Sequence, residues 1–391
     1  MTNVSASEQN QPLKIYFVIG EESGDALGSK LIDTFKHMNV DVAAVGLAGP
    51  RMQERGMSSL YDVSELSVMG ISGVVAKLPG LLRRISQTAA DVIKQNPDVL
   101  LLIDSPDFSY RVAKKVRKQK PDIKIIKYVS PSVWAWRPGR AKKISTFIDH
   151  VLAILPFEPD LLKELGGPEA TFVGHPLAAE MPEVDKAARQ NIGTPPRMVL
   201  LPGSRQSEIK RLLPFIKETL DVLKERGNEF EITLPAVTRF ADEIREAVKL
   251  WAYPVEVVTG DEARVKAFRK TDFALAASGT VTLELALYRV PMISIYRLDF
   301  MAMQIRHMLT GWTASLPNLI ADYPVVPERF NEYAHPQYVA RMVEKLVRPG
   351  HERDIQLEGF ELIRQRMAQE APSHEVAARK IIEVSKEKAG I

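Results

Sequence analysis

The chain has 391 residues, of which 45% are hydrophobic and 26% are charged, and this is the composition of a globular protein of two or three domains. Its 52 lysines and arginines exceed its 49 aspartates and glutamates by 3, so no strong positive field predicts binding to nucleic acid. Cysteine is absent, which excludes disulfides, cysteine–zinc sites and a thiol nucleophile.

The first dozen residues are polar and lack the basic start and apolar core of a signal peptide. No run of the sequence approaches the roughly 18 apolar residues of a membrane-spanning helix. We therefore expect a cytoplasmic protein whose residues 1–12 are flexible.

Short β-branched runs alternate with stretches of helical periodicity in the first half of the sequence, and we expect strands at 14–20, 41–49, 98–104, 123–130, 150–157 and 170–176. Strands that are continuous apolar runs, separated by helices, indicate a parallel sheet covered on both faces. Residues 1–178 are therefore predicted to form an N-terminal doubly wound domain.

A polar, proline-containing stretch at 179–196 is interpreted as a linker, after which the alternation restarts, with strands expected at 197–204, 230–237, 255–260, 273–280 and 290–296. A second doubly wound domain is predicted over 197–350. Residues 351–391 are expected to be helical and to pack back on the N-terminal domain. Because ligands bind beyond the carboxyl ends of the strands in open α/β sheets, two such domains facing each other would place the active site in the cleft between them.

The segment GEESGDALG (20–28) follows the first expected strand and opens a helix. Its glycines are spaced four apart, which fits neither the G-x-G-x-x-G dinucleotide fingerprint nor the Gly-Lys-Ser/Thr of a P-loop. Two interpretations stay open at this point. The segment is either a tight turn in which Ser23 or Asp25 caps the helix, or a loop that binds substrate.

Two aspartates, Asp104 and Asp107, follow the strand expected at 98–104. A carboxylate at this position can serve as a general base facing the cleft. Aspartates next to proline are also common turn formers, so catalysis and turn formation both remain open here.

In the second domain, two loops between a strand and a helix suit an anionic ligand. The first contains Gly203, Ser204 and Arg205, and the second contains Ser278, Gly279 and Thr280. Exposed N–H groups at a helix start, together with the positive end of the helix dipole, favour a diphosphate. Glu284 lies one turn into the second helix, where it could accept hydrogen bonds from a ribose diol or simply face solvent.

Two other segments combine apolar or aromatic residues with cations. SPSVWAWRPGRAKKI (130–144) could bind nucleic acid or acidic lipid headgroups, or it is a partly buried loop followed by a solvated helix. A nucleic-acid role would need a broader basic surface than the net charge suggests. LSVMGISGVVAKLPGLLRRI (66–85) could lie in a membrane interface or pack on the domain core. His175 is interpreted as a structural residue, and no metal site is predicted because no second histidine stands at metal-ligand spacing.

The sequence closely resembles the lipid-A-disaccharide synthase family in its signature segments, which are, in chain order, GEESGDALG, IDSPDF, SPSVWAWRPGRAKKI, LPFE, FVGHPL, LPGSRQSEI, ASGTVTLELAL and SLPNLIADYPVVPE. This resemblance implies a GT-B fold of two Rossmann-like domains, with the acceptor bound by the first and the nucleotide sugar by the second. It also implies an inverting transfer that joins UDP-2,3-diacylglucosamine to 2,3-diacylglucosamine 1-phosphate, releasing UDP and the β-1′,6-linked disaccharide phosphate of lipid A biosynthesis.

Carried over residue by residue, the resemblance implies a catalytic group of Asp104, as suspected base, with Glu21 and Ser23. It implies a UDP-sugar site made of Gly203, Ser204, Arg205, Ser278, Gly279, Thr280, Glu284 and Asn318. No cofactor is expected. The family implies peripheral association with the cytoplasmic face of the inner membrane of Gram-negative bacteria, and the oligomeric state stays open, a homo-oligomer included.

Three alternatives remain at this point. A UDP-N-acetylglucosamine 2-epimerase would share the fold and act on a soluble UDP-sugar without an acceptor. Another GT-B transferase would differ in its N-terminal loops. A non-catalytic protein would bind the UDP-sugar without turnover, and two carboxylates placed together in a cleft argue against it.

Overall fold

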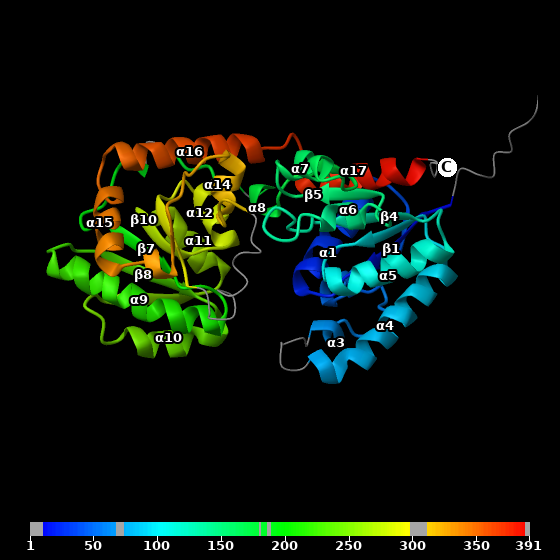
Figure 1. Cartoon of the computed structure of the whole chain (residues 1–391), viewed down its shortest axis with the longest axis horizontal. Helices are drawn as coiled ribbons and strands as arrows, with labels where there is room; N and C mark the ends of the chain where they lie inside the picture. Colours follow the sequence, from blue (N-terminus) through cyan, green and yellow to red (C-terminus); the bar gives the residue numbers. More distant parts are fainter. Residues whose placement is uncertain (1–10, 68–73, 180, 186–188, 298–310, 388–391) are drawn as a thin grey trace, which may run out of the picture. The chain divides into compact units, whose positions relative to one another are not determined.

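The computed structural model describes residues 11–67, 74–179, 181–185, 189–297 and 311–387. The chain divides into two compact units (Figure 1). Unit 1 comprises Met1–Ala179 together with Gln369–Ile391, and unit 2 comprises Glu180–Ala368.

Unit 1 is built on a six-stranded, all-parallel sheet in the order β2-β1-β3-β4-β5-β6. Its strands are β1 (Leu13–Val18), β2 (Val42–Gly46), β3 (Val99–Leu102), β4 (Lys124–Tyr128), β5 (His150–Ala153) and β6 (Glu169–Phe172). All six strands expected in this half are present. The order of strands reverses between β1 and β3, which makes the carboxyl ends of these two strands the topological switch point of the sheet.

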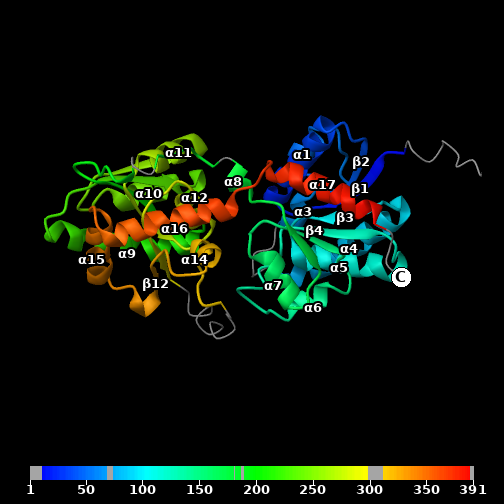
Figure 2. The ribbon, with the colours of Figure 1, turned by 90° about the horizontal axis from the view of Figure 1, so that it is seen from above.

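The helices of unit 1 connect these strands, and one more returns from the end of the chain. They are α1 (Glu22–His37), α2 (Pro50–Gln53), α3 (Ser64–Ser67), α4 (Val74–Gln95), α5 (Pro106–Gln119), α6 (Arg140–Ile144), α7 (Glu158–Glu164), α8 (Pro176–Ala179) and α17 (Ser373–Lys386). Helix α4 packs against α5, and α17 packs against α1 and β4. Figure 2 shows α17 lying across the sheet of its own unit.

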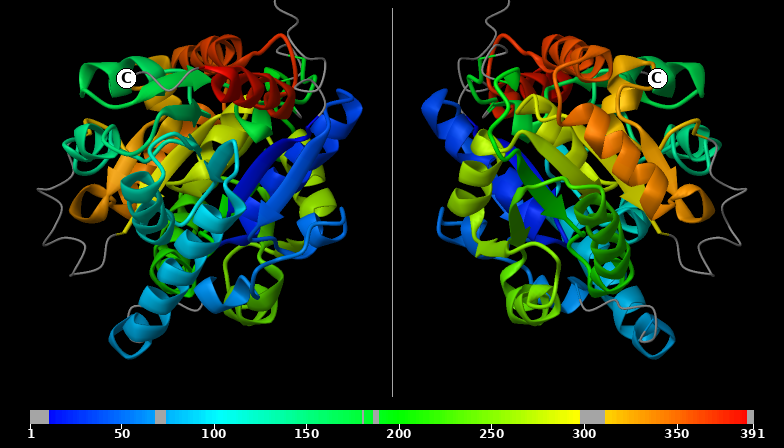
Figure 3. Two further views of the ribbon diagram at one scale, coloured as in Figure 1. Left: turned by 90° about the vertical axis from the view of Figure 1, so that its right-hand side faces the viewer. Right: turned by 90° about the vertical axis from the view of Figure 1, so that its left-hand side faces the viewer.

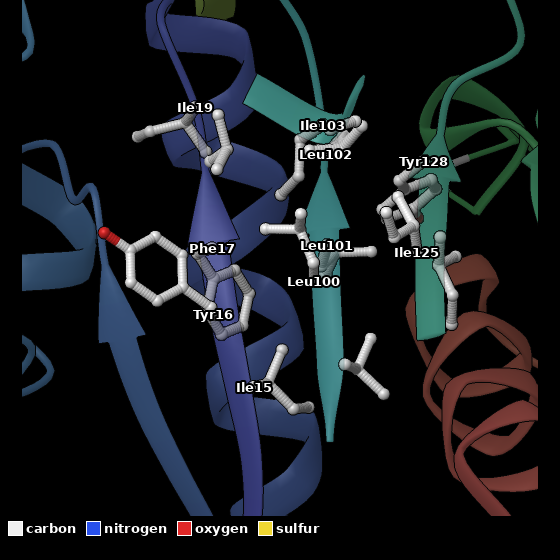
Figure 4. Packing of buried hydrophobic residues seen from close by; sticks show 14 of the residues in the cluster. Ile15, Tyr16, Phe17, Ile19, Leu100, Leu101, Leu102, Ile103, Ile125 and Tyr128 are labelled. Carbon is white, nitrogen blue, oxygen red and sulfur yellow. The ribbon is translucent and has the colours of Figure 1, made fainter. Parts of the chain in front are cut away.

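The core of unit 1 lies where β1, β3 and β4 meet. Ile15, Phe17 and Ile19 of the first strand region lie beside Leu100–Ile103 of the next, and Ile125 and Tyr128 extend the same apolar layer (Figure 4). These side chains are at most 1% exposed. Full burial of such a side chain stabilises the fold by about 1.5–3 kcal/mol, so this layer firmly anchors the strands that carry the switch-point loops.

Unit 2 has a second six-stranded parallel sheet in the order β12-β11-β10-β7-β8-β9. Its strands are β7 (Arg197–Leu201), β8 (Glu231–Ala236), β9 (Val255–Thr259), β10 (Phe273–Ala277), β11 (Met292–Tyr296) and β12 (Glu328–Phe330). The first five were expected, and β12 was not. The order of strands reverses between β7 and β10, so this pair forms the switch point of unit 2.

Helices cover both faces of this sheet, as the side views in Figure 3 show. They are α9 (Gln206–Glu225), α10 (Ala241–Val248), α11 (Asp261–Lys270), α12 (Thr280–Leu287), α14 (Leu316–Ala321), α15 (Pro336–Leu346) and α16 (His351–Met367), with short 3₁₀ turns at Thr238–Phe240 and Asn331–Tyr333. Helix α15 packs on α9, whereas α16 packs on α12 and α14. The helical segment expected at 351–391 is thus divided, because α16 belongs to unit 2 and α17 to unit 1.

Candidate functional site

At the switch point of unit 1, a carboxylate is held by the loop of the neighbouring strand. Asp104 lies two residues past β3, and its two oxygens accept hydrogen bonds from the N–H groups of Gly20 (2.6 Å) and Glu21 (3.0 Å). These two residues follow β1, the neighbouring strand in the sheet. The structure therefore joins Asp104 to the GEESGD loop through two backbone N–H groups.

Opposing effects act on the pKa of the Asp104 carboxyl. Burial raises the pKa of the Asp104 carboxyl to about 6, while the nearby Lys127 cation and the two N–H groups act to lower it. The negative charge of Glu21, an exposed residue, also raises the pKa of Asp104. A carboxyl with a pKa near 6 is ionised at neutral pH and still basic enough to take a proton, which is the property of a general base.

The glycines of the loop allow this contact. A Cβ on Gly24 would lie 1.9 Å from Asp104 Oδ2, and one on Gly20 would lie 2.3 Å from Ser105 Oγ. Ser105 itself has a left-handed backbone (φ 43°), a conformation that a non-glycine residue adopts only when its surroundings enforce it. The spacing of the glycines therefore serves close packing against the Asp104 loop.

The interpretation of Ser23 or Asp25 as the cap of the first helix is wrong. Helix α1 begins at Glu22 with Glu21 as its N-cap, so Ser23 and Asp25 lie within its first turn. The buried carboxylate of Asp25 instead accepts hydrogen bonds from the N–H groups of Arg51 (2.9 Å) and Met52 (3.1 Å) at the start of α2. Asp25 therefore ties two helices together, whereas the side chains of Glu21 and Ser23 are exposed.

The tryptophan-rich segment forms a partly buried loop followed by a solvated helix. Trp134 and Trp136 are half-buried. The ring of Trp134 meets Phe157 edge-on at 6.2 Å, and the Arg137 guanidinium lies 5.0 Å from the Trp136 ring. Helix α6 then exposes Lys142 and Lys143.

Beneath this loop, Glu158 of the LPFE segment is a buried carboxyl. It accepts hydrogen bonds from the N–H groups of Ile154 (3.2 Å) and Leu155 (3.0 Å). Burial raises the pKa of Glu158 to about 7. This side chain therefore fixes the turn after β5 rather than facing a ligand.

The segment expected at 66–85 lies only partly within the described residues, because 68–73 are outside them. In the described part of α4, Leu82 is 46% exposed, while Leu81 packs on the core of unit 1. Arg84 forms an ion pair with Glu65 (2.6 Å), and its guanidinium lies 4.3 Å from the Tyr61 ring. Of the helices in the described ranges, none is long and apolar enough to cross a bilayer.

At the switch point of unit 2, both predicted anion-binding loops follow neighbouring strands. Leu201 at the end of β7 pairs with Ala276 near the end of β10. The loop of Gly203–Arg205 and the loop of Ser278–Thr280 therefore leave the same edge of the sheet, each leading into a helix, α9 or α12. This is the crevice in which open α/β sheets bind their ligands.

The two helix starts differ in how their N–H groups are used. At α9, the Glu208 carboxylate accepts from the N–H groups of Ser204 (3.0 Å) and Arg205 (3.2 Å), and the Arg205 guanidinium pairs with it (3.0 Å). Gly203 is required here, since it has a φ of 105° and a Cβ would lie 2.5 Å from Glu208 Oε2. At α12, Gly279 and Thr280 are exposed, and within the described residues no side chain caps the helix.

Glu284 is buried rather than facing solvent. It is 7% exposed and pairs with Arg264 of α11 at 2.5 Å. Arg264 also reaches Asp261 at 3.1 Å. The carboxylate is thus held in one orientation, one turn into the helix that begins at the open loop.

Asn318 makes its hydrogen bonds inside unit 2. Its amide oxygen accepts from the Val326 N–H (2.7 Å), and its amide nitrogen lies within hydrogen-bond distance of the Val326 carbonyl (3.0 Å), Thr313 (3.2 Å) and Glu328 (3.3 Å). The side chain is 1% exposed. These contacts fix the turn before β12 and use the hydrogen-bonding groups of the amide, which is a structural role within unit 2.

His175 has the structural role expected of it. Its Nδ1 accepts a hydrogen bond from the Leu177 N–H (3.1 Å), and burial lowers its pKa to about 4. The ring is therefore neutral at physiological pH. Across the described parts of the chain, no group of three or more histidines, aspartates or glutamates is placed to hold a metal ion.

Three residues at the two switch points were not expected from the sequence. Lys127 lies beneath Asp104, Glu208 occupies the start of α9, and Arg264 orients Glu284. Two of them, Lys127 and Glu208, had a signal in the sequence. A lysine interrupts the apolar strand IIKYV, and a glutamate stands three residues after Arg205, the spacing of a capping box.

The chain is similar to known proteins over most of its length. The family model described as lipid-A-disaccharide synthetase matches residues 15–382. The lipid-A-disaccharide synthase of Rhodopseudomonas palustris (strain HaA2) is 42% identical over 353 residues, covering 89% of this chain and 90% of the relative. That of Nitrobacter winogradskyi is 41% identical over 386 residues, covering 97% of each. The chain belongs to the lipid-A-disaccharide synthase family.

Solved structures similar to this family member share its fold at low sequence identity. The glycosyltransferase of kitacinnamycin has a TM-score of 0.61 at 14% identity, covering 96% of this chain and 100% of its own. UDP-GlcNAc 2-epimerase of Neisseria meningitidis, bound to UDP-GlcNAc, has a TM-score of 0.56 at 13% identity, covering 95% and 98%. Together with the two parallel sheets, these neighbours confirm the predicted GT-B fold.

Proposed function

We propose that this member of the lipid-A-disaccharide synthase family transfers the 2,3-diacylglucosaminyl group of UDP-2,3-diacylglucosamine to the 6-hydroxyl of 2,3-diacylglucosamine 1-phosphate. The products are UDP and the β-1′,6-linked disaccharide 1-phosphate. The membership shown over nearly the whole chain makes it a glycosyltransferase of lipid A biosynthesis.

The observation that carries the proposal is the Asp104 carboxylate at the switch point of unit 1. It is held by two N–H groups and has a pKa raised to about 6 by burial. In the proposed reaction, the acceptor hydroxyl oxygen forms a bond to C1 of the donor sugar while the bond from C1 to the UDP oxygen breaks. The hydroxyl proton passes to Asp104, and attack from the face opposite to UDP inverts the configuration at C1.

Glu21 and Ser23 have a supporting role in this proposal. Both are exposed in the segment whose Gly20 and Glu21 N–H groups donate to Asp104, and a carboxylate and a hydroxyl there can accept hydrogen bonds from the hydroxyls of a sugar acceptor. They would bind and orient the acceptor so that its 6-hydroxyl lies within reach of Asp104. Correct placement of a hydroxyl against its base contributes a large part of catalysis in bimolecular transfers.

The UDP-sugar is assigned to unit 2. The exposed start of α12 at Gly279 and Thr280 offers N–H groups and a positive helix end to the diphosphate, and Ser278, whose own N–H donates to the Ile295 carbonyl (3.1 Å), would contribute its hydroxyl. The ribose diol would donate to the Glu284 carboxylate, which Arg264 holds in place. Gly203, Ser204 and Arg205 complete the site from the neighbouring loop, and the Arg205 cation meets the negative charge that grows on the departing UDP.

A direct experiment tests the reaction. The purified chain is incubated with the two diacylglucosamine substrates, and the products are identified by mass spectrometry. Disaccharide 1-phosphate and UDP in equal amounts are expected, with a rate that falls as the pH decreases through about 6, because Asp104 then takes up a proton. UDP released without disaccharide, or no turnover of folded protein, would contradict the proposal.

An epimerase is the second candidate, because several structural neighbours are UDP-N-acetylglucosamine 2-epimerases. At 11–13% identity these neighbours support the fold alone. A parallel incubation with UDP-N-acetylglucosamine and no acceptor separates the two candidates. We expect the soluble sugar to be recovered unchanged.

Peripheral contact with the cytoplasmic face of the inner membrane is part of the proposal, because both substrates carry acyl chains. Leu82 and Arg83 on the exposed side of α4, and the cations of α6, supply an apolar contact and positive charge. Co-sedimentation with vesicles that contain anionic lipid tests this. Leu82→Glu should reduce the bound fraction severalfold, whereas Leu81 is unsuitable for substitution since it packs on the core.

A further inference from the structure

A lysine is buried in the centre of the sheet of unit 1. Lys127 is the fourth residue of β4, which pairs with β3 on one side and β5 on the other. The residue is 3% exposed, and its neighbours Ile126 and Tyr128 are fully buried. Lysine is almost never buried to this extent unless its charge is compensated, so the position requires a specific explanation.

The ammonium group of Lys127 reaches the chain segment that carries Asp104. Its Nζ donates to the carbonyl oxygen of Ile103 at 2.7 Å and approaches that of Asp104 at 3.4 Å. The hydroxyl of Ser109 donates to the same Asp104 carbonyl at 2.9 Å. The backbone before the left-handed Ser105 is thus held by the ammonium of Lys127, from the neighbouring strand β4, and by the hydroxyl of Ser109, from the following helix α5.

The charges that face this ammonium come from two loops. They are Asp104, which follows β3, and Glu21, which follows β1. Burial lowers the pKa of Lys127 to about 8, and the two carboxylates counteract that change. Lys127 in turn lowers the pKa of Asp104 against the larger effect of burial. Between about pH 6 and pH 8, the ammonium and the Asp104 carboxylate are therefore both charged.

We infer that Lys127 is a positioning residue for the transfer reaction, whose buried ammonium holds the Ile103–Asp104 backbone in place and keeps the Asp104 side chain ionised. It does not touch a substrate. This inference rests on the proposed function, in which Asp104 takes the proton of the acceptor hydroxyl. Without the cation, burial and Glu21 would leave Asp104 protonated over more of the physiological range, and the base would be lost there.

The test compares the pH dependence of kcat/KM in three variants. Lys127→Gln keeps a donor for the Ile103 carbonyl but removes the charge, and Lys127→Met removes both. Lys127→Arg keeps the charge. Lys124→Gln, at the half-buried start of the same strand, is the control for the loss of a lysine that does not contact the Asp104 loop.

A nearby opposite charge typically shifts the pKa of a carboxyl by about 1–3 units, and Lys127 is the strongest of the groups that lower the pKa of Asp104. We therefore expect the acid limb of the kcat/KM profile to move up by about 1 pH unit in the two uncharged variants. Below the limb this shift lowers kcat/KM roughly tenfold, and above pH 8 it changes kcat/KM little. The Arg variant and the Lys124→Gln control should keep the limb of the unmodified protein. A purely structural role would lower the rate at every pH without moving the limb.

Circular dichroism establishes which variants are folded, and either uncharged variant suffices for the comparison. A folded, uncharged variant with its acid limb at the original pH would overturn the inference. The carboxyl ¹³C resonance of Asp104, assigned with Asp104→Asn, gives the same shift without turnover. If the unmodified protein makes no disaccharide, the proposed function fails, whereas an active protein with an unmoved limb refutes only the role of Lys127.

Discussion

At the switch point of unit 1, the N–H groups of Gly20 and Glu21 donate to a carboxylate that comes from the next strand. At the switch point of unit 2, the N–H groups of Ser204 and Arg205 donate to the carboxylate of Glu208, three to four residues further along their own chain segment. Both sheets thus place a carboxylate against backbone N–H groups at the edge where ligands bind.

The difference lies in what each carboxylate can do. Asp104 is fixed from a neighbouring element and supported by Lys127, so it is a built-in part of its site. Glu208 belongs to the helix that it caps and can rotate away on its own side-chain torsions. We interpret the switch point of unit 1 as a site organised around a permanently placed base, Asp104. At the switch point of unit 2, we interpret Glu208 as a side chain that occupies N–H groups suited to a diphosphate.

The largest effect is expected from Asp104→Asn. The amide cannot take the proton of the acceptor hydroxyl, so the transferase rate should fall by about 100- to 10,000-fold, the usual contribution of a general base. The UDP affinity should stay within about twofold, because the nucleotide is assigned to unit 2 and independent sites couple by no more than about 0.3–0.5 kcal/mol. Steady-state kinetics and isothermal titration calorimetry measure the two quantities, and a near-normal rate would remove Asp104 from the role of base.

The next effect is expected from Gly24→Ala. The new Cβ would lie 1.9 Å from Asp104 Oδ2, so the carboxylate must move, and a displacement of about 1 Å in an active site can cost about 100-fold in rate. Gly350→Ala is the matched control, since nothing lies within 4 Å of a Cβ there. Equal rates for the two variants would mean that the carboxylate does not need its observed position.

In unit 2, Glu284→Gln should weaken UDP binding by about 10- to 100-fold, because a hydrogen bond to a charged group contributes about 1.5–3 kcal/mol. The control is Asp261→Asn, which removes the exposed partner of Arg264 but leaves Glu284 intact. Calorimetric titration with UDP gives both affinities. If Asp261→Asn weakens UDP as strongly as Glu284→Gln, the buried carboxylate is not the group that binds the ribose.

The smallest effect is expected from Glu208→Gln. This change removes a negative charge from the start of α9, so UDP should bind about threefold to tenfold more tightly, since like charges near an anion site are unfavourable by about 1 kcal/mol at such distances. Asp221→Asn, on the same helix but paired with Lys217, is the control. Weaker binding would show that the Glu208 carboxylate supports the bound state and that the two switch points are more alike than we propose.

Most of the fold follows from the sequence, because the strands of a doubly wound sheet are buried on both faces and appear as apolar runs. All eleven expected strands are present, although the predictions extend past the true ends. The strand expected at 98–104 ends at Leu102. Strand β12 was missed because its three residues, Glu328–Phe330, form no apolar run and are recognised only by pairing with β11.

For the candidate site, the sequence predicts where the residues stand along the fold but not which side chains they contact. Strand ends predict where Asp104 and Ser278 lie, since parallel strands present their carboxyl ends at one edge. Nothing local predicts that Asp25 binds the start of α2, or that Glu284 is buried against Arg264, because these partners lie 26–27 and 20 residues away. The same limit applies to Asn318, whose buried amide is explained only by the folded turn around it.

The division of the chain between its units has a consequence for its synthesis. Ala377, Ala378, Ile381 and Val384 of α17 belong to the buried core of unit 1, although this unit starts at the N-terminus. A ribosome therefore releases all of unit 2 before it delivers the last helix of unit 1. The unit that emerges first is completed last, and until then the apolar surface that α17 covers on α1 and β4 stays exposed, a condition that favours aggregation and chaperone binding.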